Sequence, residues 1–379
     1  MNHFLALALC LCGSNSTDQV AALRSEGPSA LERLLERYRS EAPGPAHDAL
    51  EATIDAVAAQ RYATVSGLYW YTDLQQAEAA ASASGKPILS LRMLGRLDED
   101  LSCANSRFFR IALYANTNVS QFLRENVVLH WSSERPVPKV TIEFGDGRAI
   151  HTTLAGNSAH YVLDAAGRVI DVLPGLYSPV AFQRELEALL PLARLSSTLG
   201  DSEREVRIRR ELAARDSRHP ETWAGAAFYA PPSAARLPDI AAAEATAFSK
   251  SLFEVPMLPR PLAREMLRLV PVQRLEEARL DASSRALFAR LAPADLAAGE
   301  VEAMRAAFES SIAADTQMNE LQLRPQIHGH MLASRTIPSF EVLNRVIYDE
   351  VFLTPRRDPW LGLRTEGFFS ALPNGGISR

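Results

Sequence analysis

The sequence is poor in cysteine, and this scarcity excludes one class of protein. Three cysteines occur among 379 residues, at positions 10, 12 and 103. They are too few and too unevenly spread for a small domain that is held together by disulfides. The fold must therefore be stabilised by the burial of apolar side chains.

Positive charge is not in excess. Lysine and arginine total 40 against 45 acidic residues, which gives a net charge of −5. Only Lys86, Lys139 and Lys250 are lysines, so 40 − 3 leaves 37 arginines. A chain with this balance lacks the electrostatic footprint of a nucleic-acid-binding protein. Nucleic acid is therefore not an expected partner.

Long apolar runs are missing too. No run approaches the roughly 18 apolar residues that a membrane span needs, so no integral span is expected. The segment FLALALCLCG (4–13) is the only candidate for targeting, and no Lys or Arg precedes it. This slightly favours the cytoplasm over the periplasm. Whether residues 1–14 form a cleaved signal peptide stays open.

The sequence also lacks the familiar motifs of nucleotide and metal enzymes. There is no G-x-G-x-x-G that opens a β–α unit, no G-x-x-x-x-G-K-[ST], no H-E-x-x-H and no G-x-S-x-G. No cofactor is therefore expected.

The patterning that is present predicts three regions. The chain is 47% hydrophobic and 22% charged, as is usual for a globular protein, and its length allows two or three domains. Residues 1–65 hold the N-terminal apolar segment and a helical lead-in. Residues 66–196 alternate strand and helix patterns, and 197–379 form a C-terminal all-α domain with an irregular tail.

The central region predicts an α/β domain. Apolar, β-like runs alternate with helical patterns, and the short links between them favour parallel pairing of the first strands. Two hairpins then follow, so the expected sheet is mixed, with helices on both faces. The predicted strands are 68–72, 87–94 and 127–131, the hairpins 141–154 and 160–173, and the helices 73–85, 101–115, 119–126 and 178–195.

Two stretches of this region resemble thioredoxin-like domains. In WYTDLQQAEAAASASGKPILSL (70–91), a helix ends in a Gly-Lys-Pro run before a buried strand, as at the opening of those domains. HYVLDAAGRVIDVLPGLYSPVAFQREL (160–186) resembles their closing hairpin and last helix. The likeness covers about 130 of the 379 residues. It implies a thioredoxin-like fold for residues 66–196.

The resemblance also places a candidate thiol site. Active thioredoxin-like proteins carry C-x-x-C at a helix N-terminus after the central strand, where the first thiol attacks and the second resolves the mixed disulfide. The matching stretch here is Cys103-Ala104-Asn105-Ser106. It implies a monothiol site at most, in which Ser106 bonds the thiolate but cannot close a disulfide. Arg107 favours the thiolate, whereas the acidic run 98–100 disfavours it.

The turn that would face the thiol departs from the family as well. The usual cis-proline is missing from the segment Asn157-Ser158-Ala159-His160. A cis bond without proline costs about 3 kcal/mol, so this turn is predicted to be rebuilt. Together with Asn105, these four residues are the predicted binding residues for a client or peptide.

Three functions stay open on this evidence. The first is a thiol-dependent oxidoreductase or thiol-transfer protein that acts on a protein thiol or disulfide through Cys103. The second is a non-catalytic binding or scaffold protein that recognises a peptide or protein partner, with Cys103 buried and inert. The third is a metal-binding protein that uses Cys103 and His160, although zinc or copper needs three or four ligands. No oligomeric state is predicted.

The helical region has polar residues where its apolar stripe should continue. In the segment 301–332, Asp315 and Asn319 follow the apolar residues at helical spacing. A buried polar group without a partner costs about 1–3 kcal/mol, so both must find partners. With Glu320 and His328 they either line a pocket or make an interdomain polar contact, or they form a polar interface where the helical region docks onto the α/β domain. Pro325 is expected to interrupt the helix.

Overall fold

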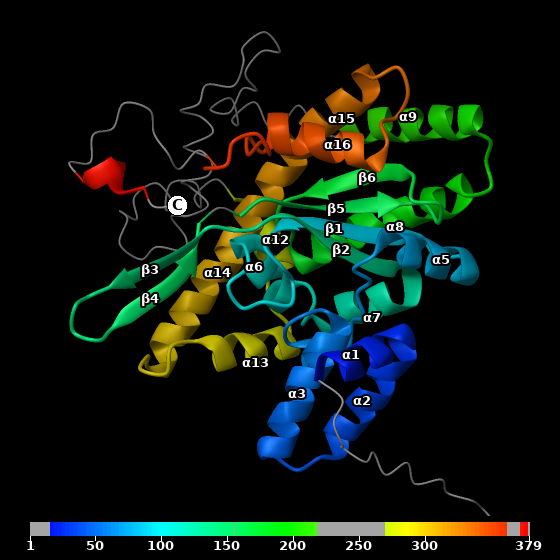
Figure 1. The fold of residues 1–379 in the computed structure, drawn as a ribbon. Coiled ribbons are helices and arrows are strands. Elements are labelled where there is room, and N and C mark those ends of the chain that lie inside the picture. The colour runs from blue at the N-terminus through cyan, green and yellow to red at the C-terminus, as the bar shows by residue number, and fades with distance from the viewer. Residues whose placement is uncertain (1–15, 155, 218–269, 362–371, 378–379) are drawn as a thin grey trace, which may run out of the picture.

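The computed structural model describes residues 16–154, 156–217, 270–361 and 372–377. Figure 1 shows an N-terminal group of helices below a central sheet, and further helices from the C-terminal half above and beside that sheet. The apolar segment 4–13, with Cys10 and Cys12, lies outside the described residues. So does most of the predicted irregular tail 358–379.

The N-terminal lead-in is helical. Pro28 and Pro45 each occupy a first helical position, where a proline loses no hydrogen bond. Leu31 and Ile54 centre a small apolar cluster between the helices. The elements are α1 (Ser16–Ser25), α2 (Pro28–Ser40), α3 (Pro45–Ala58) and the single turn α4 (Ala63–Ser66).

The central sheet has four strands in the order β2-β1-β5-β6. β1 and β2 are parallel, and β5 is antiparallel to both β1 and β6, which confirms the predicted mixed sheet. All four strands are largely buried. Their bounds are β1 (Ile88–Leu94), β2 (Val128–Arg135), β5 (Ser158–Leu163) and β6 (Val169–Pro174).

The strand predicted at 68–72 is wrong apart from a single bridge. Tyr71 bonds to β2 through its amide, 2.9 Å from the Leu129 oxygen, and through its own oxygen, 3.0 Å from the Trp131 amide. The preceding amide, that of Trp70, donates to Ala58 at the end of α3 instead. The amide of Trp70 is therefore bonded to α3 and does not extend the pairing with β2.

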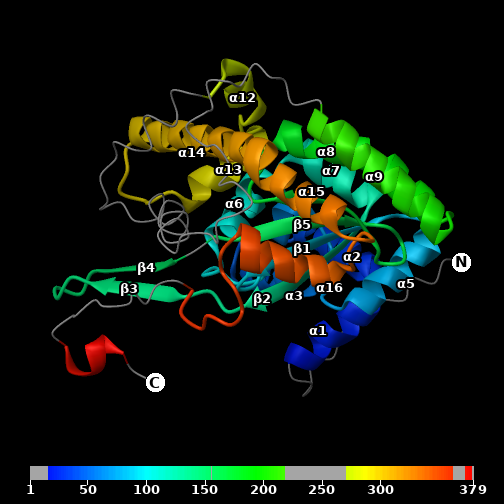
Figure 2. The same cartoon turned by 90° about the horizontal axis from the view of Figure 1, so that it is seen from above.

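Helices cover both faces of the sheet because side chains alternate along each strand. Leu91 and His160 point to one face, and Arg92 and Tyr161 to the other, where Tyr161 packs on Phe340 at 4.7 Å between ring centroids. Figure 2 shows α8 and α16 on opposite sides of β1 and β5. The helices are α5 (Leu74–Ser84), α6 (Ala104–Ala112), α7 (Thr117–Asn126), α8 (Pro179–Ser196) and α16 (Phe340–Val346).

The predicted first hairpin forms a separate two-stranded sheet. β3 (Lys139–Glu143) and β4 (Ala149–Thr153) turn at Gly145 and Gly147, both of which have positive φ. The hairpin extends away from the body in both ribbon views (Figures 1 and 2). Phe144 near its tip is 46% exposed.

The described residues beyond 197 contain no strand, as predicted. The helix over 298–333 is continuous, so the expected break at Pro325 is wrong. A π-helical turn ends at Leu323, two residues before Pro325. It changes the hydrogen-bond register of the helix at the place where the proline cannot donate an amide hydrogen bond. The elements are α9 (Asp201–Ser217), α12 (Val272–Glu277), α13 (Ala282–Leu291), α14 (Ala298–Met318), the π turns η2 (Asn319–Leu323) and η3 (Ile347–Val351), α15 (Arg324–Ala333) and the 3₁₀ turn η4 (Pro373–Gly376).

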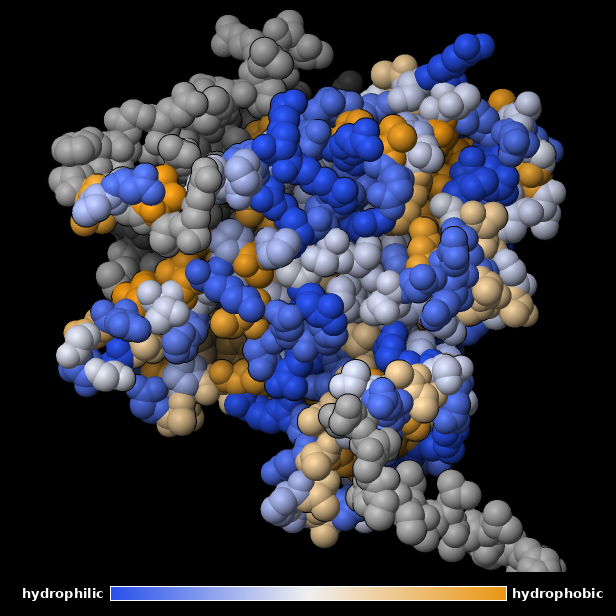
Figure 3. All heavy atoms as spheres, viewed as in Figure 1, coloured by the Kyte–Doolittle hydropathy of each residue, from blue (hydrophilic) through white to orange (hydrophobic). Residues whose placement is uncertain are grey.

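One apolar cluster joins the sheet to the C-terminal helices. Leu89 of β1, Phe182 of α8, Ile312 of α14 and Leu343 of α16 all belong to it. On the face drawn in Figure 3, the described residues present mostly hydrophilic side chains, with apolar ones in small separate patches. No helix among the described residues is long and apolar enough to cross a membrane.

Candidate functional site

Cys103 lies where the resemblance placed it, at the start of the helix that follows β1. It is the N-cap of α6, in an extended conformation, and its amide lies 3.3 Å from the Leu94 oxygen at the end of β1. The side chain has 0% exposure and belongs to the main apolar cluster. The thiol is therefore buried within the body of the protein.

Ser106 is also buried, but its hydroxyl is used by the backbone. It donates to the carbonyl oxygen of Cys103 at 2.9 Å and shares a short hydrogen bond with the Ser102 hydroxyl. The predicted partner Arg107 donates to the Ser102 oxygen and to the Thr153 hydroxyl, each at 3.2 Å. Both residues thus fix the loop before α6.

The buried cation beside this loop is Arg110, which the sequence analysis missed. It is 2% exposed and donates to the Glu99 oxygen and the Ser102 hydroxyl, each at 2.9 Å. Burial lowers the pKa of Arg110 to about 10, against the opposing charges of Tyr62 and Asp100. The sequence signal for its burial was an arginine directly after two phenylalanines on an otherwise amphipathic helix.

The acidic run in the inserted loop is bound by cations. Asp98 pairs with Arg96 at 2.7 Å, and Asp100 pairs with Arg61 at 2.8 Å. Because these carboxylates already have partners of opposite charge, the negative field that they place on the thiol is reduced.

The turn at 157–160 faces the Cys103 loop, as expected. Asn105 donates to the Ser158 hydroxyl at 2.9 Å across this contact. The side-chain amide of Asn157 donates to the hydroxyl of Thr354 at 3.0 Å, and the Tyr348 hydroxyl donates to the Asn157 oxygen at 3.3 Å. No peptide bond among the described residues is cis. The C-terminal segment therefore covers the rebuilt turn.

His160 is sealed inside the core. Its Nε2 lies 2.7 Å from the Tyr114 hydroxyl, and Phe109 and Phe182 pack edge-on against the ring. Burial lowers the pKa of His160 to about 3, so the ring is neutral at physiological pH. The neighbouring Ala159 of β5 pairs with Arg92 of β1, and its side chain is buried in the main apolar cluster. Among the described residues no group of three or more His, Cys, Asp or Glu side chains is arranged to hold a metal.

The predicted polar pair on the long helix lies at a different place, near the end of β6. Asn319 donates to the Leu176 oxygen at 2.7 Å, and the Ser178 amide donates to the Thr316 hydroxyl at 2.7 Å. Asp315 precedes these residues on α14 and is half-buried. These contacts match the predicted polar interface between the helical region and the α/β domain.

A buried charge network extends this interface. Asp171 of β6 is fully buried and accepts bonds from Arg324 at 2.6 Å and from the Nε2 of His328 at 2.9 Å. The other ring nitrogen of His328 lies 2.6 Å from Asp216. The signal that the sequence analysis missed is an aspartate inside the apolar strand VIDVLP, because a buried carboxylate requires a buried partner.

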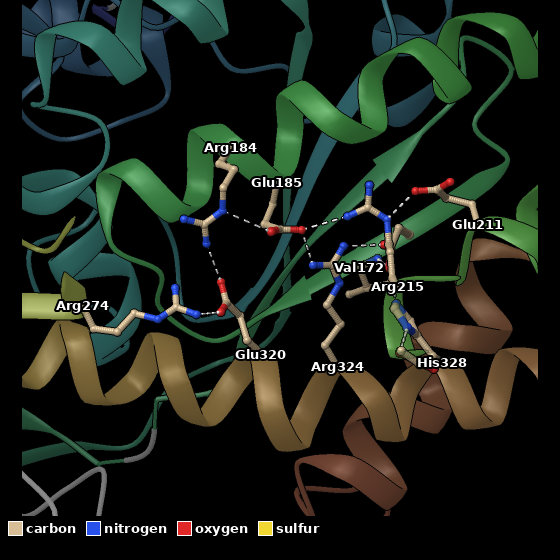
Figure 4. Close-up of polar contacts among 11 residues, drawn as sticks. Val172, Arg184, Glu185, Glu211, Arg215, Arg274, Glu320, Arg324 and His328 are labelled. Atoms are coloured by element: carbon tan, nitrogen blue, oxygen red, sulfur yellow. Dashed lines mark hydrogen bonds and ion pairs between the residues drawn. The ribbon is translucent and has the colours of Figure 1, made fainter. Parts of the chain in front are cut away.

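Further ion pairs tie the long helix to α8 and α9. Arg324 reaches Glu185 at 2.6 Å, and Arg215 reaches the same carboxylate at 2.9 Å (Figure 4). Glu320 pairs with Arg184 at 3.0 Å and also with Arg274. Every charged group named here is matched by an opposite charge from another element, so the network clamps the C-terminal helices onto the sheet.

Comparison with protein-family models, curated proteins and solved structures finds no match. The two buried clusters, one around Cys103 and one around Asp171, must therefore be interpreted from their own geometry. The first holds a buried thiol at the start of a helix, and the second has the features of a structural clamp.

The clamp makes stability depend on pH. Burial alone would lower the pKa of His328, but the Asp171 carboxylate and hydrogen bonds to Asp171 and Asp216 outweigh it and raise that pKa from 6.5 to about 9. A raised pKa stabilises the fold fully below 6.5, and this stabilisation is lost as the pH rises through 9. We expect the free energy of unfolding to fall by about 3 kcal/mol between pH 6 and pH 10.

Urea unfolding at a series of pH values measures this effect, and the variant His328→Gln is the control. The variant should lose most of the decline over the same range. An identical decline in both proteins would contradict the assignment to His328.

Asp171 makes stability depend on pH in the acid range. Burial opposes its ionisation, but Arg324 and His328 hold its pKa well below 3.8, so stability is also lost in strong acid.

Proposed function

We propose that residues 66–196 form a thioredoxin-like domain that serves as a non-catalytic binding platform for a peptide or protein partner. In this proposal Cys103 is a structural residue. Three features support the thioredoxin-like part. β1 is an inner strand, Cys103 starts the helix after it, and the β5–β6 hairpin is followed directly by α8. Each matches an expectation of the resemblance at 70–91 and 160–186.

The burial of Cys103 carries the non-catalytic part. A thiol that exchanges with a disulfide must reach the sulfur of its partner, and reactive cysteines are accordingly at least partly exposed. Cys103 has 0% exposure. Within this proposal it fills space at the junction of β1 and α6, as a small apolar residue does.

Occupation of the facing turn supports the non-catalytic part of the proposal as well. A client would have to contact Asn157, yet this residue already bonds to Tyr348 and Thr354 of the same chain. On the other face of the sheet, Tyr161 donates to Asn344 at 2.9 Å, and the Arg92 guanidinium lies over the ring of Phe340. The chain's own C-terminal segment thus occupies the turn through which a redox domain would receive its substrate, and its helices cover the other face of the sheet.

A monothiol redox or thiol-transfer role is the second candidate, and the surroundings of the sulfur favour it. Cys103 caps the N-terminus of a nine-residue helix, where the helix dipole stabilises a thiolate. The buried guanidinium of Arg110 is close enough for a Cys103 thiolate to raise its pKa. A motion that uncovered the thiol would expose a site in which the helix dipole and the Arg110 guanidinium both favour the thiolate.

Reactivity of the native thiol separates the two candidates. The binding-platform proposal expects Cys103 to resist an alkylating reagent until the protein unfolds. The redox candidate expects rapid alkylation of the folded protein at neutral pH, because a stabilised thiolate is the reactive form.

A further inference from the structure

A cleft of about 710 Å³ separates the N-terminal helices from the central sheet. Leu31 and Leu35 of α2 form part of one wall, and Val127 and Leu129 at the start of β2 form part of the other. Its volume lies within the range of about 300–1,000 Å³ that is usual for small-molecule sites. Polar and apolar groups line the cleft in similar measure, and it is large enough to hold a small organic ligand.

Three cations border this cleft: Arg39, Lys86 and Arg124. None of them takes part in an ion pair with a carboxylate of the described residues. Arg124 donates to the Ser66 oxygen at 2.5 Å, and Lys86 donates to the Arg124 oxygen at 2.9 Å. Their remaining N–H groups are therefore available to a ligand.

The electrostatics favour an anion at this end of the cleft. Burial lowers the pKa of Arg124, and the charge of Arg39 lowers it further, against the opposing effect of Glu125. Two guanidinium groups that repel each other are stabilised by an anion placed between them. Glu32 and Glu36 of α2 also line the cleft, and they are exposed, as Arg39 and Arg124 are. Their charge disfavours an anion along the middle of α2 and favours one at the end of the cleft where Arg39 and Arg124 lie.

We propose that this cleft binds a small organic anion, a carboxylate or a phosphate ester, with its charge held by Arg39 and Arg124. The apolar body of the ligand lies between Leu35 of α2 and Val127, the residue that precedes β2. Because guanidinium forks match both carboxylate and phosphate oxygens, the charge chemistry is shared by the two ligand classes.

The site goes beyond the proposed binding of a peptide or protein partner, and it is independent of the thiol. Lys86 and Val128 stand at the beginnings of β1 and β2, whereas Cys103 follows the end of β1. A strand of seven residues separates the two places by roughly 20 Å. Loss of ligand binding would leave thiol protection unchanged, and a reactive thiol would leave the cleft intact.

Calorimetric titration of the full-length protein with decyl phosphate, decanoate and decanol tests the proposal, each below its aggregation concentration. Decyl phosphate or decanoate should bind at one site, and decanol, which lacks the charge, at least about 10-fold more weakly. The stronger of the two anions identifies the ligand class. No saturable binding of either anion up to about 1 mM would overturn the proposal.

Matched arginine variants tie the binding to the cleft. Arg124→Gln should weaken the affinity at least about 10-fold, and Arg124→Lys, which keeps the charge, should retain most of it. Arg37→Gln removes an arginine from α2 that does not line the cleft and pairs with Glu41 at 3.8 Å, so it should change the affinity less than about 2-fold. Equal affinities in Arg124→Gln, Arg39→Gln and the unaltered protein would overturn the proposal. A thermal melt of each variant shows that it is folded.

Discussion

Replacing Asp171 by asparagine is expected to lower the free energy of unfolding by about 3–5 kcal/mol. The carboxylate receives Arg324 on one oxygen and His328 on the other, inside a fully buried site. An asparagine has one oxygen and one NH₂ group, so one of the two cations would face a donor instead of an acceptor. The substitution would leave buried positive charge without its counter-charge, which is the costly case.

Urea unfolding measures this loss, with Asp146→Asn as the matched control. Asp146 also pairs with an arginine, Arg148, at 2.6 Å, but both side chains are exposed at the tip of the first hairpin. Exposed pairs contribute about 0–1 kcal/mol, so the control should be nearly neutral. Similar losses in the two variants would show that the Asp171 network does not clamp the C-terminal helices.

Replacing Gly175 by alanine is expected to cost about 2–4 kcal/mol. Gly175 follows β6 with φ of +69°, a conformation that favours glycine. An added Cβ would lie 2.5 Å from both the Oδ1 and the Nδ2 of Asn319, so this buried side chain, which donates to the Leu176 oxygen, would have to move. The loss therefore combines backbone strain with disruption of this contact between the two elements.

Gly145→Ala separates these two contributions. Gly145 has φ of +78°, and nothing lies within 4 Å of a Cβ placed there. It should show the backbone cost alone, about 1–2 kcal/mol. Asn319→Ala in the Gly175→Ala background should restore part of the lost stability, because it removes the clash. Additive effects of the two substitutions would contradict a direct contact.

The sequence predicted those elements that local pattern determines. The apolar runs at 87–94 and 127–131, the glycines of the first hairpin and the Ser-Pro start of α8 each carry their own signal, and the structure has strands, a turn and a helix there. The segment 68–72 shows the limit of this method. It has strand-forming residues, but Ala58 of the lead-in helix takes the amide of Trp70.

The candidate site was predicted in position but not in accessibility. The place of Cys103 before α6 and the contact of Asn105 with the facing turn follow from a local resemblance. The cover over that turn comes from Tyr348 and Thr354, about 190 residues away along the chain. The partners of Asp171 are equally remote, with Arg324 separated from it by 153 residues. Contacts of this range leave no periodic pattern in a single sequence.

The central claim, that Cys103 is structural, is tested most directly by its alkylation rate. In the variant Cys10→Ser/Cys12→Ser, Cys103 is the only thiol. Its reaction with iodoacetamide at neutral pH is followed by mass spectrometry, in the folded protein and in concentrated urea. We predict a reaction at least about 100-fold slower in the folded protein, because the thiol must wait for local opening. A folded protein that reacts as fast as free cysteine, or faster, would contradict the account and assign Cys103 to thiol chemistry.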